Sequence, residues 1–279
     1  MDVFGIDFTS TPKRGKPLTC LQCTIERGVL RAGSLEKWPT FLLFEQALQR
    51  PGPWIAGIDF PFGQSRKFIE TIGWPMDWHS YVRHAQSLGR IGFRDALDTY
   101  RYARPDGDKE HRRKTDVAAG SISPQKLYGV PVGLMFFEGA PRLAVSGVSI
   151  PRIQEGDPRR IVVEAYPGVL ARQIIGRRSY KHDAKSKQTT AQRQARRDLL
   201  EGLISGEARN LYGFDIEAPD ALCEDAGGDH LDALLCAIQA AWAWQNRACG
   251  YGAPPSVDPL EGWIADPSLA VPGRGQDEQ

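Results

Sequence analysis

The sequence predicts an α/β protein whose core is a mixed sheet of five strands flanked by helices. Three strand-like segments joined by short turns open the chain, which is typical of an antiparallel meander. A helical segment then precedes a fourth strand, and such a crossover places the fourth strand parallel to the first. Near the end of the chain, a long and almost wholly apolar helix is suited to cover the sheet.

The strands and the first helix follow from residue periodicity. Val3–Phe8 is an apolar run with one acid, and Leu18–Glu26 alternates in the manner of a half-buried strand. Gly28–Gly33 is the expected third strand. Thr40–Gln49 changes to helical spacing and ends at a Pro-Gly-Pro breaker, after which Trp54–Phe60 forms the fourth strand.

Residues 64–150 lose this regular pattern and predict a largely helical insertion in the sheet or a cap over it. The expected elements are helices at 66–73, 78–88 and 93–104, a charged loop at 104–115, and one strand of a hairpin at 142–148.

The regular pattern resumes after the insertion. The expected elements are a fifth strand at 160–166, helices at 169–175, 190–204 and 229–246, and an extended tail at 251–279 that either docks or remains disordered. We therefore expect one domain over 1–250, interrupted by the insertion and followed by the tail.

The amino-acid composition limits the possible classes of protein but does not identify a function. The 279 residues are 41% hydrophobic and 25% charged, with a formal net charge of +1, which is typical of a globular protein with a sizeable core. A near-neutral charge neither requires nor excludes nucleic acid, because the distribution of charge matters more. No apolar run is long enough to span a bilayer, and the N-terminus enters a strand-like segment at once. We therefore expect neither a membrane segment nor a secretory signal.

The five cysteines favour a reducing compartment. Their odd number and scattered positions argue against a disulfide scaffold, so we expect a cytoplasmic protein. Cys20 and Cys23 form an isolated C-x-x-C motif in a strand, where residues three apart point to opposite faces. We interpret both as small buried hydrophobic residues rather than metal ligands.

Five acids are placed where they can meet. Three lie at the carboxyl ends of expected strands, and two lie three residues apart on the first turn of the last helix: Asp7, Asp59, Glu164, Asp229 and Asp232. Each has an ordinary interpretation as a cap or turn residue, and an N-cap accounts well for Asp229. Together they suggest an oxygen-lined site, because clustered carboxylates stay ionised only around a cation. Such ligands favour Mg²⁺ or Mn²⁺.

The ordered motifs resemble a known family. They are GIDF at 5–8, GIDFPFG at 57–63, RRKTD at 112–116, EAYPG at 164–168 and GDHLDALLCAIQAAW at 228–242. The set resembles the domain of unknown function 429 family, predicted nucleases of RNase H-like fold related to RuvC-type resolvases.

This resemblance implies a metal-dependent nuclease that cleaves phosphodiester bonds in DNA or RNA by a two-metal mechanism. It implies a catalytic set of Asp7, Asp59, Glu164, Asp229 and Asp232, of which the four aspartates bind metal and Glu164 binds metal or orients a lysine or arginine. Phosphate contacts are expected from Arg112, Arg113, Lys185 and Lys187, the two lysines lying near Arg177 and Arg178.

Two other functions remain open. The turn Thr9–Thr11 after the first strand also resembles the phosphate-binding turn of actin-like ATPases and sugar kinases, which predicts an ATP-dependent phosphotransferase. Alternatively, the protein is a non-catalytic binding protein that retains a remnant site. A homodimer is compatible with each of these functions.

Overall fold

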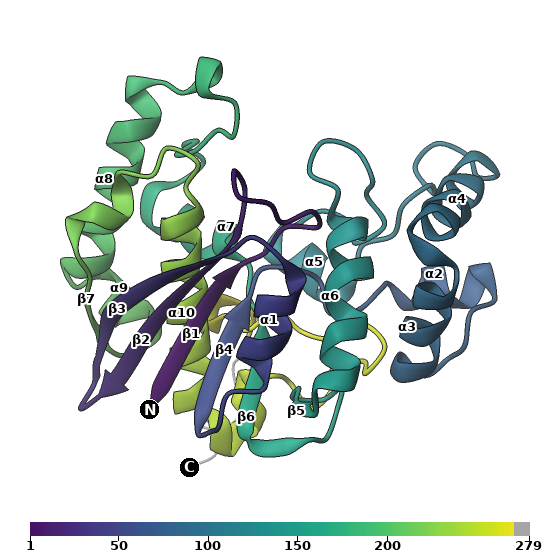
Figure 1. The fold of residues 1–279 in the computed structure, drawn as a ribbon, viewed down its shortest axis with the longest axis horizontal. Helices are drawn as coiled ribbons and strands as arrows, with labels where there is room; N and C mark the ends of the chain where they lie inside the picture. The colour runs from purple at the N-terminus through teal and green to yellow at the C-terminus, as the bar shows by residue number, and fades with distance from the viewer. Residues whose placement is uncertain (271–279) are drawn as a thin grey trace, which may run out of the picture.

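The computed structural model describes residues 1–270, and its centre is a seven-stranded mixed sheet in the order β5-β6-β4-β1-β2-β3-β7 (Figure 1). The strands are β1 (Asp2–Asp7), β2 (Leu18–Glu26), β3 (Val29–Trp38), β4 (Trp54–Ile58), β5 (Val148–Ser149), β6 (Asp157–Glu164) and β7 (Asp215–Glu217).

The strand directions are those predicted from the sequence. Strands β1, β2 and β3 form an antiparallel meander, and β4 pairs with β1 in parallel, as the crossover predicted. Strand β6 then pairs with β4, also in parallel. The expectation of five strands was wrong because β5 and β7 add one at each edge. With two and three residues, they are too short to show a periodic pattern.

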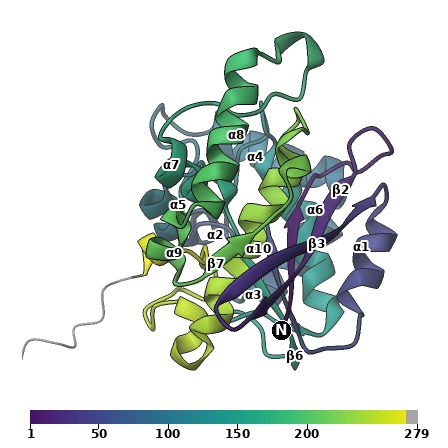
Figure 2. The same cartoon turned by 90° about the vertical axis from the view of Figure 1, so that its left-hand side faces the viewer.

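Helices cover both faces of the sheet (Figures 1 and 2). They are α1 (Phe41–Leu48), α2 (Arg66–Ile72), α3 (Trp78–Ser87), α4 (Gly89–Tyr102), α5 (Lys114–Ala119), α6 (Val132–Ser146), α7 (Pro167–Ile175), α8 (Thr190–Ile204), α9 (Glu207–Tyr212) and α10 (Asp229–Gln245). One core packs α7, α8 and α10 on one face of the sheet. The other joins the opposite face to α1 and α6 and continues into α2–α4, of which α3 and α4 pack against α6 (Figure 1). Within residues 1–270, no helix has the length and apolarity needed to cross a membrane.

Most of the expected hairpin strand at 142–148 is instead the end of helix α6, which runs to Ser146, and only Val148 lies in a strand, β5. This helix contains Pro141, a residue that disfavours a helix interior because it removes a hydrogen bond and crowds the preceding turn. Buried side chains such as Phe136 and Leu143 hold the segment helical. Tertiary packing thus overrides the local signal, which a single sequence does not reveal.

Two glycines allow α10 to lie directly on the sheet. Gly5 in β1 and Gly57 in β4 are register partners, one from each copy of the GIDF motif. An added Cβ at Gly5 would lie 1.8 Å from the carbonyl oxygen of Ala233, and one at Gly57 would lie 2.3 Å from that of Cys236. The helix backbone therefore touches the strand backbones, a distance that no larger residue permits.

The segment that follows α10 docks on the domain. Ile264 forms a parallel bridge with Glu164, and the N–H of Ala265 donates to the Glu164 carbonyl at 2.9 Å. The Tyr81 hydroxyl donates to the carbonyl of Leu260 at 2.7 Å. The expected tail is therefore packed as far as residue 270, and its last part, 271–279, lies outside the described residues.

The close approach of α10 predicts a specific sensitivity. Gly5→Ala is expected to lower the free energy of unfolding by about 1–3 kcal/mol or more, because the new methyl group overpacks the helix–strand contact. Urea denaturation measures this change. Gly15→Ala is the matched control, since nothing lies within 4 Å of a Cβ there. Equal stability of the two variants would contradict the close contact.

Candidate functional site

Two aspartates lie side by side at the carboxyl edge of the sheet. Asp7 is the last residue of β1, and Asp59 directly follows the parallel neighbour β4. The N–H of Asp59 donates to the carbonyl of Ile6 at 3.0 Å, which extends the ladder to the carboxylates. This edge, where parallel strands end, is the usual position of sites in α/β proteins.

Helix α10 brings two more aspartates to this edge. Its N-cap is Gly228, with φ of 80°, so Asp229 is the first helical residue rather than the cap. Asp229 accepts a hydrogen bond from the Lys16 amine at 2.9 Å. Asp232, one turn further, is fully buried. The helix thus presents one partly exposed and one buried carboxylate to the strand ends.

Asp232 is held by two residues that the sequence analysis did not identify. The Tyr180 hydroxyl donates to its Oδ1 at 2.5 Å, and the Lys181 amine donates to its Oδ2. The methylene stem of Lys181 lies over Gly228, where an added Cβ would stand 2.7 Å from its Cδ. Arg196 in turn fixes the backbone here by donating to the Tyr180 carbonyl at 2.9 Å.

These groups form one electrostatic unit. Burial raises the pKa of Asp7 well above its ordinary value, and repulsion from Asp232, Asp229 and Asp59 adds to this while Lys181 opposes it. Burial and the charge of Asp232 likewise raise the pKa of Asp59, to about 7. Neither carboxylate accepts a hydrogen bond from the described residues that would offset its burial.

Two lysines supply positive charge to the cluster. Burial opposes the charge on Lys181, but Asp232, Tyr180 and Asp7 outweigh burial and raise its pKa well above the ordinary value. Lys16 also has a raised pKa, because its hydrogen bonds to Asp183 and Asp229 outweigh its burial. Four clustered aspartates therefore face two ammonium groups, which leaves an excess of negative charge.

The donor atoms of the cluster are of the type that binds a hard cation, but their arrangement does not form a complete coordination site. Its donors are carboxylate oxygens, the ligands that Mg²⁺ and Mn²⁺ prefer. Among residues 1–270, however, no three carboxylate, imidazole or thiol side chains converge closely enough to hold an ion. Lys181 at Asp232 and Lys16 at Asp229 take up part of the negative charge instead.

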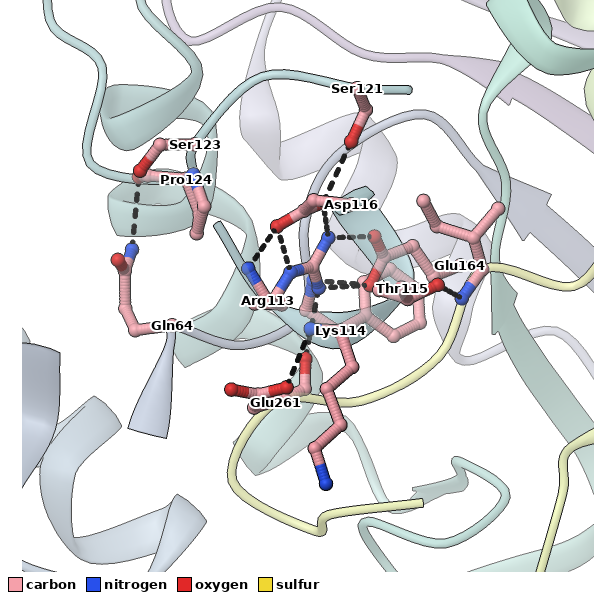
Figure 3. A network of polar contacts seen from close by, with 12 residues as sticks. Gln64, Arg113, Lys114, Thr115, Asp116, Ser121, Ser123, Pro124, Glu164 and Glu261 are labelled. Atoms are coloured by element: carbon pink, nitrogen blue, oxygen red, sulfur yellow. Dashed lines mark hydrogen bonds and ion pairs between the residues drawn. The ribbon is translucent and has the colours of Figure 1, made fainter. Parts of the chain in front are cut away.

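A second network of buried charges adjoins the cluster and centres on Arg113 (Figure 3). Its guanidinium is 1% exposed and forms bidentate pairs with Asp116, at 2.9 and 2.7 Å, and with Glu164, at 2.8 and 2.6 Å. The remaining N–H donates to the carbonyl of Glu261 at 2.9 Å. All five guanidinium donors are therefore used within the protein.

This network corrects two expectations about the site. Arg113 has no donor left for a phosphate, so it does not fit the substrate-binding role inferred from the RRKTD motif. Glu164 uses both carboxylate oxygens on Arg113 and also accepts from the N–H of Phe62 at 2.9 Å. Of its two expected roles, the structure favours orienting an arginine over binding a metal or acting in catalysis.

The other expected phosphate contacts lie at the surface. Arg112 is exposed beside the buried Arg113. Lys185 and Lys187 form a short, exposed 3₁₀ helix on the segment that begins with Tyr180 and Lys181. Their roles in substrate binding stay predictions.

A family model described as a protein of unknown function (DUF429) matches residues 5–256. The chain belongs to this family. No curated protein and no solved structure matches the chain. The DUF429 match spans every residue of the carboxylate cluster and ends before Glu261, so the segment that completes the Arg113 network lies beyond it.

The raised pKa of Asp59 predicts how pH affects this DUF429 protein. An aspartate in the unfolded chain has a pKa of about 4, whereas that of Asp59 in the folded chain is about 7. Between pH about 4 and pH about 7 the folded state therefore binds more protons than the unfolded state, and the free energy of unfolding falls as pH rises. Asp59→Asn removes this penalty. We expect a gain in unfolding free energy on the order of 1–2 kcal/mol at about pH 8, and less at about pH 5.

Urea denaturation in a chelating buffer measures this difference. The control is Asp95→Asn on the exposed side of α4, for which we expect no such gain. If Asp59→Asn were no more stable than the native chain at the higher pH, the electrostatic account of the cluster would be wrong.

The Arg113 network predicts a large loss of stability. Arg113→Ala leaves Asp116 and Glu164 buried without their partner, so we expect a loss of about 3–5 kcal/mol in chemical denaturation. Its exposed neighbour provides the control, because Arg112→Ala is expected to change stability by less than about 0.5 kcal/mol. Similar losses for the two variants would show that Arg113 is not the centre of the network.

Proposed function

We propose that this protein hydrolyses phosphodiester bonds in nucleic acid with the help of Mg²⁺ or Mn²⁺. The observation that carries the proposal is the gathering of Asp7, Asp59, Asp229 and Asp232 at one edge of the sheet, where burial and the neighbouring negative charges raise the pKa of Asp7 and of Asp59. A protein keeps such costly groups together when they serve a function, and perturbed carboxylates are typical of catalytic sites.

An RNase H-like fold is the finer part of the proposal. It is supported by the resemblance of the GIDF, GIDFPFG and DHLDAL motifs and by the central strands. Those strands combine an antiparallel meander with parallel neighbours β4 and β6. The two short edge strands lie outside this central set. DUF429 membership is consistent with this interpretation and carries no activity of its own.

The four aspartates are the residues that would hold the ion. A divalent ion there supplies a Lewis acid and an activated water for attack on phosphorus. Lys181 pairs with Asp232 in the structure, and its amine would neutralise a phosphate oxygen if it left that carboxylate. Tyr180 keeps Asp232 oriented through its hydroxyl. Glu164 is assigned no chemical step.

The proposal predicts metal-dependent cleavage of DNA or RNA that requires Asp7. With Mg²⁺ or Mn²⁺, the native chain is expected to cleave at least one of four labelled substrates: single-stranded or duplex DNA, or single-stranded or duplex RNA. Asp7→Asn is expected to lower the rate by more than about a hundredfold, because it removes a central ligand and not an outer contact. Gel separation of the products measures cleavage.

Asp95→Asn, which changes an exposed acid on α4, is the matched control and should leave the rate unchanged. Calorimetric titration with Mn²⁺ tests the metal directly, with loss of binding expected for Asp7→Asn. If all four substrates remain intact with both metals, the nuclease proposal fails. Hydrolysis of ATP in that case would favour the phosphotransferase alternative that the Thr9–Thr11 turn suggests.

A further inference from the structure

A cavity of about 740 Å³ opens beside the carboxylate cluster. Its walls come from α5, from α7 and from the segment 176–180, with Val117 on one wall and Arg172 and Arg177 on another. Figure 2 shows α5 and α7 side by side, although about fifty residues separate them in the chain. The volume lies within the range of about 300–1,000 Å³ that is typical of ligand pockets.

Among residues 1–270, the side chains that line the cavity include three arginines and no carboxylate. Arg172 is anchored, since it donates to the carbonyl of Ala119 and lies 5.5 Å from the centre of the Tyr166 ring. Arg178 pairs with Asp198 at 2.5 Å. Arg177 is exposed and has no ion pair with the described residues. The lining therefore attracts anions, and Arg177 has its donors available.

Tyr180 connects the cavity to the aspartates. Tyr180 is one of the residues that line the cavity, and its hydroxyl donates to Asp232 at 2.5 Å. One residue thus belongs both to the arginine-lined cavity and to the carboxylate cluster. A ligand that spans both regions needs negative charges at regular intervals, since one of its anionic groups lies on the arginines while another reaches the reacting centre.

We propose that the cavity binds the phosphate backbone of a single strand of the nucleic-acid substrate, next to the bond that the carboxylate cluster cleaves. The inference rests on the proposed function and names the form of its substrate. Arginine suits this task because its planar guanidinium binds phosphate bidentately. The volume of this cavity is sufficient for a short stretch of one strand.

Arg177 carries the first test. Fluorescence anisotropy of a labelled single-stranded oligonucleotide is measured in a chelating buffer, so that binding is recorded without cleavage. Arg177→Ala is expected to weaken binding roughly tenfold, the loss of one charge-assisted hydrogen bond. It should also reduce the slope of log affinity against log salt by about 0.7. Arg94→Ala, an exposed change on α4, is the matched control and should alter neither quantity.

The opposite wall provides an independent test. Val117 is 56% exposed on α5 and lines the cavity, so a substitution there does not disturb the core. Val117→Glu places a carboxylate opposite the arginines and is expected to weaken strand binding several-fold, whereas the uncharged Val117→Gln is not. Near-UV circular dichroism of the variants checks that each remains folded.

The outcomes separate this inference from the proposed function. If Arg177→Ala and Val117→Glu weaken strand binding but the native chain cleaves no substrate, the cavity is a strand-binding site and the proposed nuclease activity is refuted. If the protein cleaves nucleic acid but neither wall substitution changes strand binding, the proposed role of the cavity is refuted and the proposed nuclease activity is retained. Equal losses for Arg177→Ala and Arg94→Ala also refute the role of the cavity, because binding then follows net charge alone. If inorganic phosphate competes with the oligonucleotide and longer strands bind no more tightly, the ligand of the cavity is a small phosphate compound and not a nucleic-acid strand.

Discussion

Backbone contact between α10 and the two central parallel strands is the constraint on which the rest of the structure depends. Because Gly5 and Gly57 have no side chain, the helix lies against β1 and β4 at van der Waals distance, and its first turn reaches the ends of both strands. The GIDF motif therefore has two linked parts. Its glycine sets the height of the helix above the sheet, and its aspartate meets the acids that the helix brings.

The molecule separates its buried charges into two neighbouring groups that differ in how completely their charges are paired. Around Arg113, each donor has an acceptor and the network is satisfied, which is the condition under which buried ions are tolerated. Around Asp7 and Asp59, repulsion is left uncompensated by hydrogen bonds. Glu164 stands at the boundary, because its pairing with Arg113 commits it to the satisfied group although it lies on the strand next to Asp59. The contrast is the reason that the proposed chemistry is assigned to the aspartates and not to the Arg113 network.

The sequence predicts this fold well for elements that show a periodic residue pattern. It predicts poorly the positions of residues that are set by contacts between distant parts of the chain. The meander, the parallel crossover and the apolar α10 each span enough residues to show a period, and the strand-end position of Asp7 and Asp59 follows from them. Lys181 lies in an irregular basic segment, and only the folded chain carries its amine to Asp232. The role of Arg113 was likewise not predictable, because its partner Glu164 is 51 residues away and a motif does not distinguish a buried arginine from an exposed one.

The segment at 258–265 is distant in sequence from everything it stabilises. The carboxylate of Glu261 accepts from the backbone N–H of Lys114 and of Arg66, each at 2.9 Å, and its carbonyl accepts from Arg113. Asp258 pairs with Arg66. During synthesis, the backbone N–H groups of Lys114 and Arg66 therefore leave the ribosome before their acceptor exists, because Glu261 follows them by 147 and 195 residues. At ordinary translation rates this delay is on the order of 7–40 s. Completion of the core is thus a late event in the life of the nascent chain, and it requires residues that lie beyond the boundary of the family match.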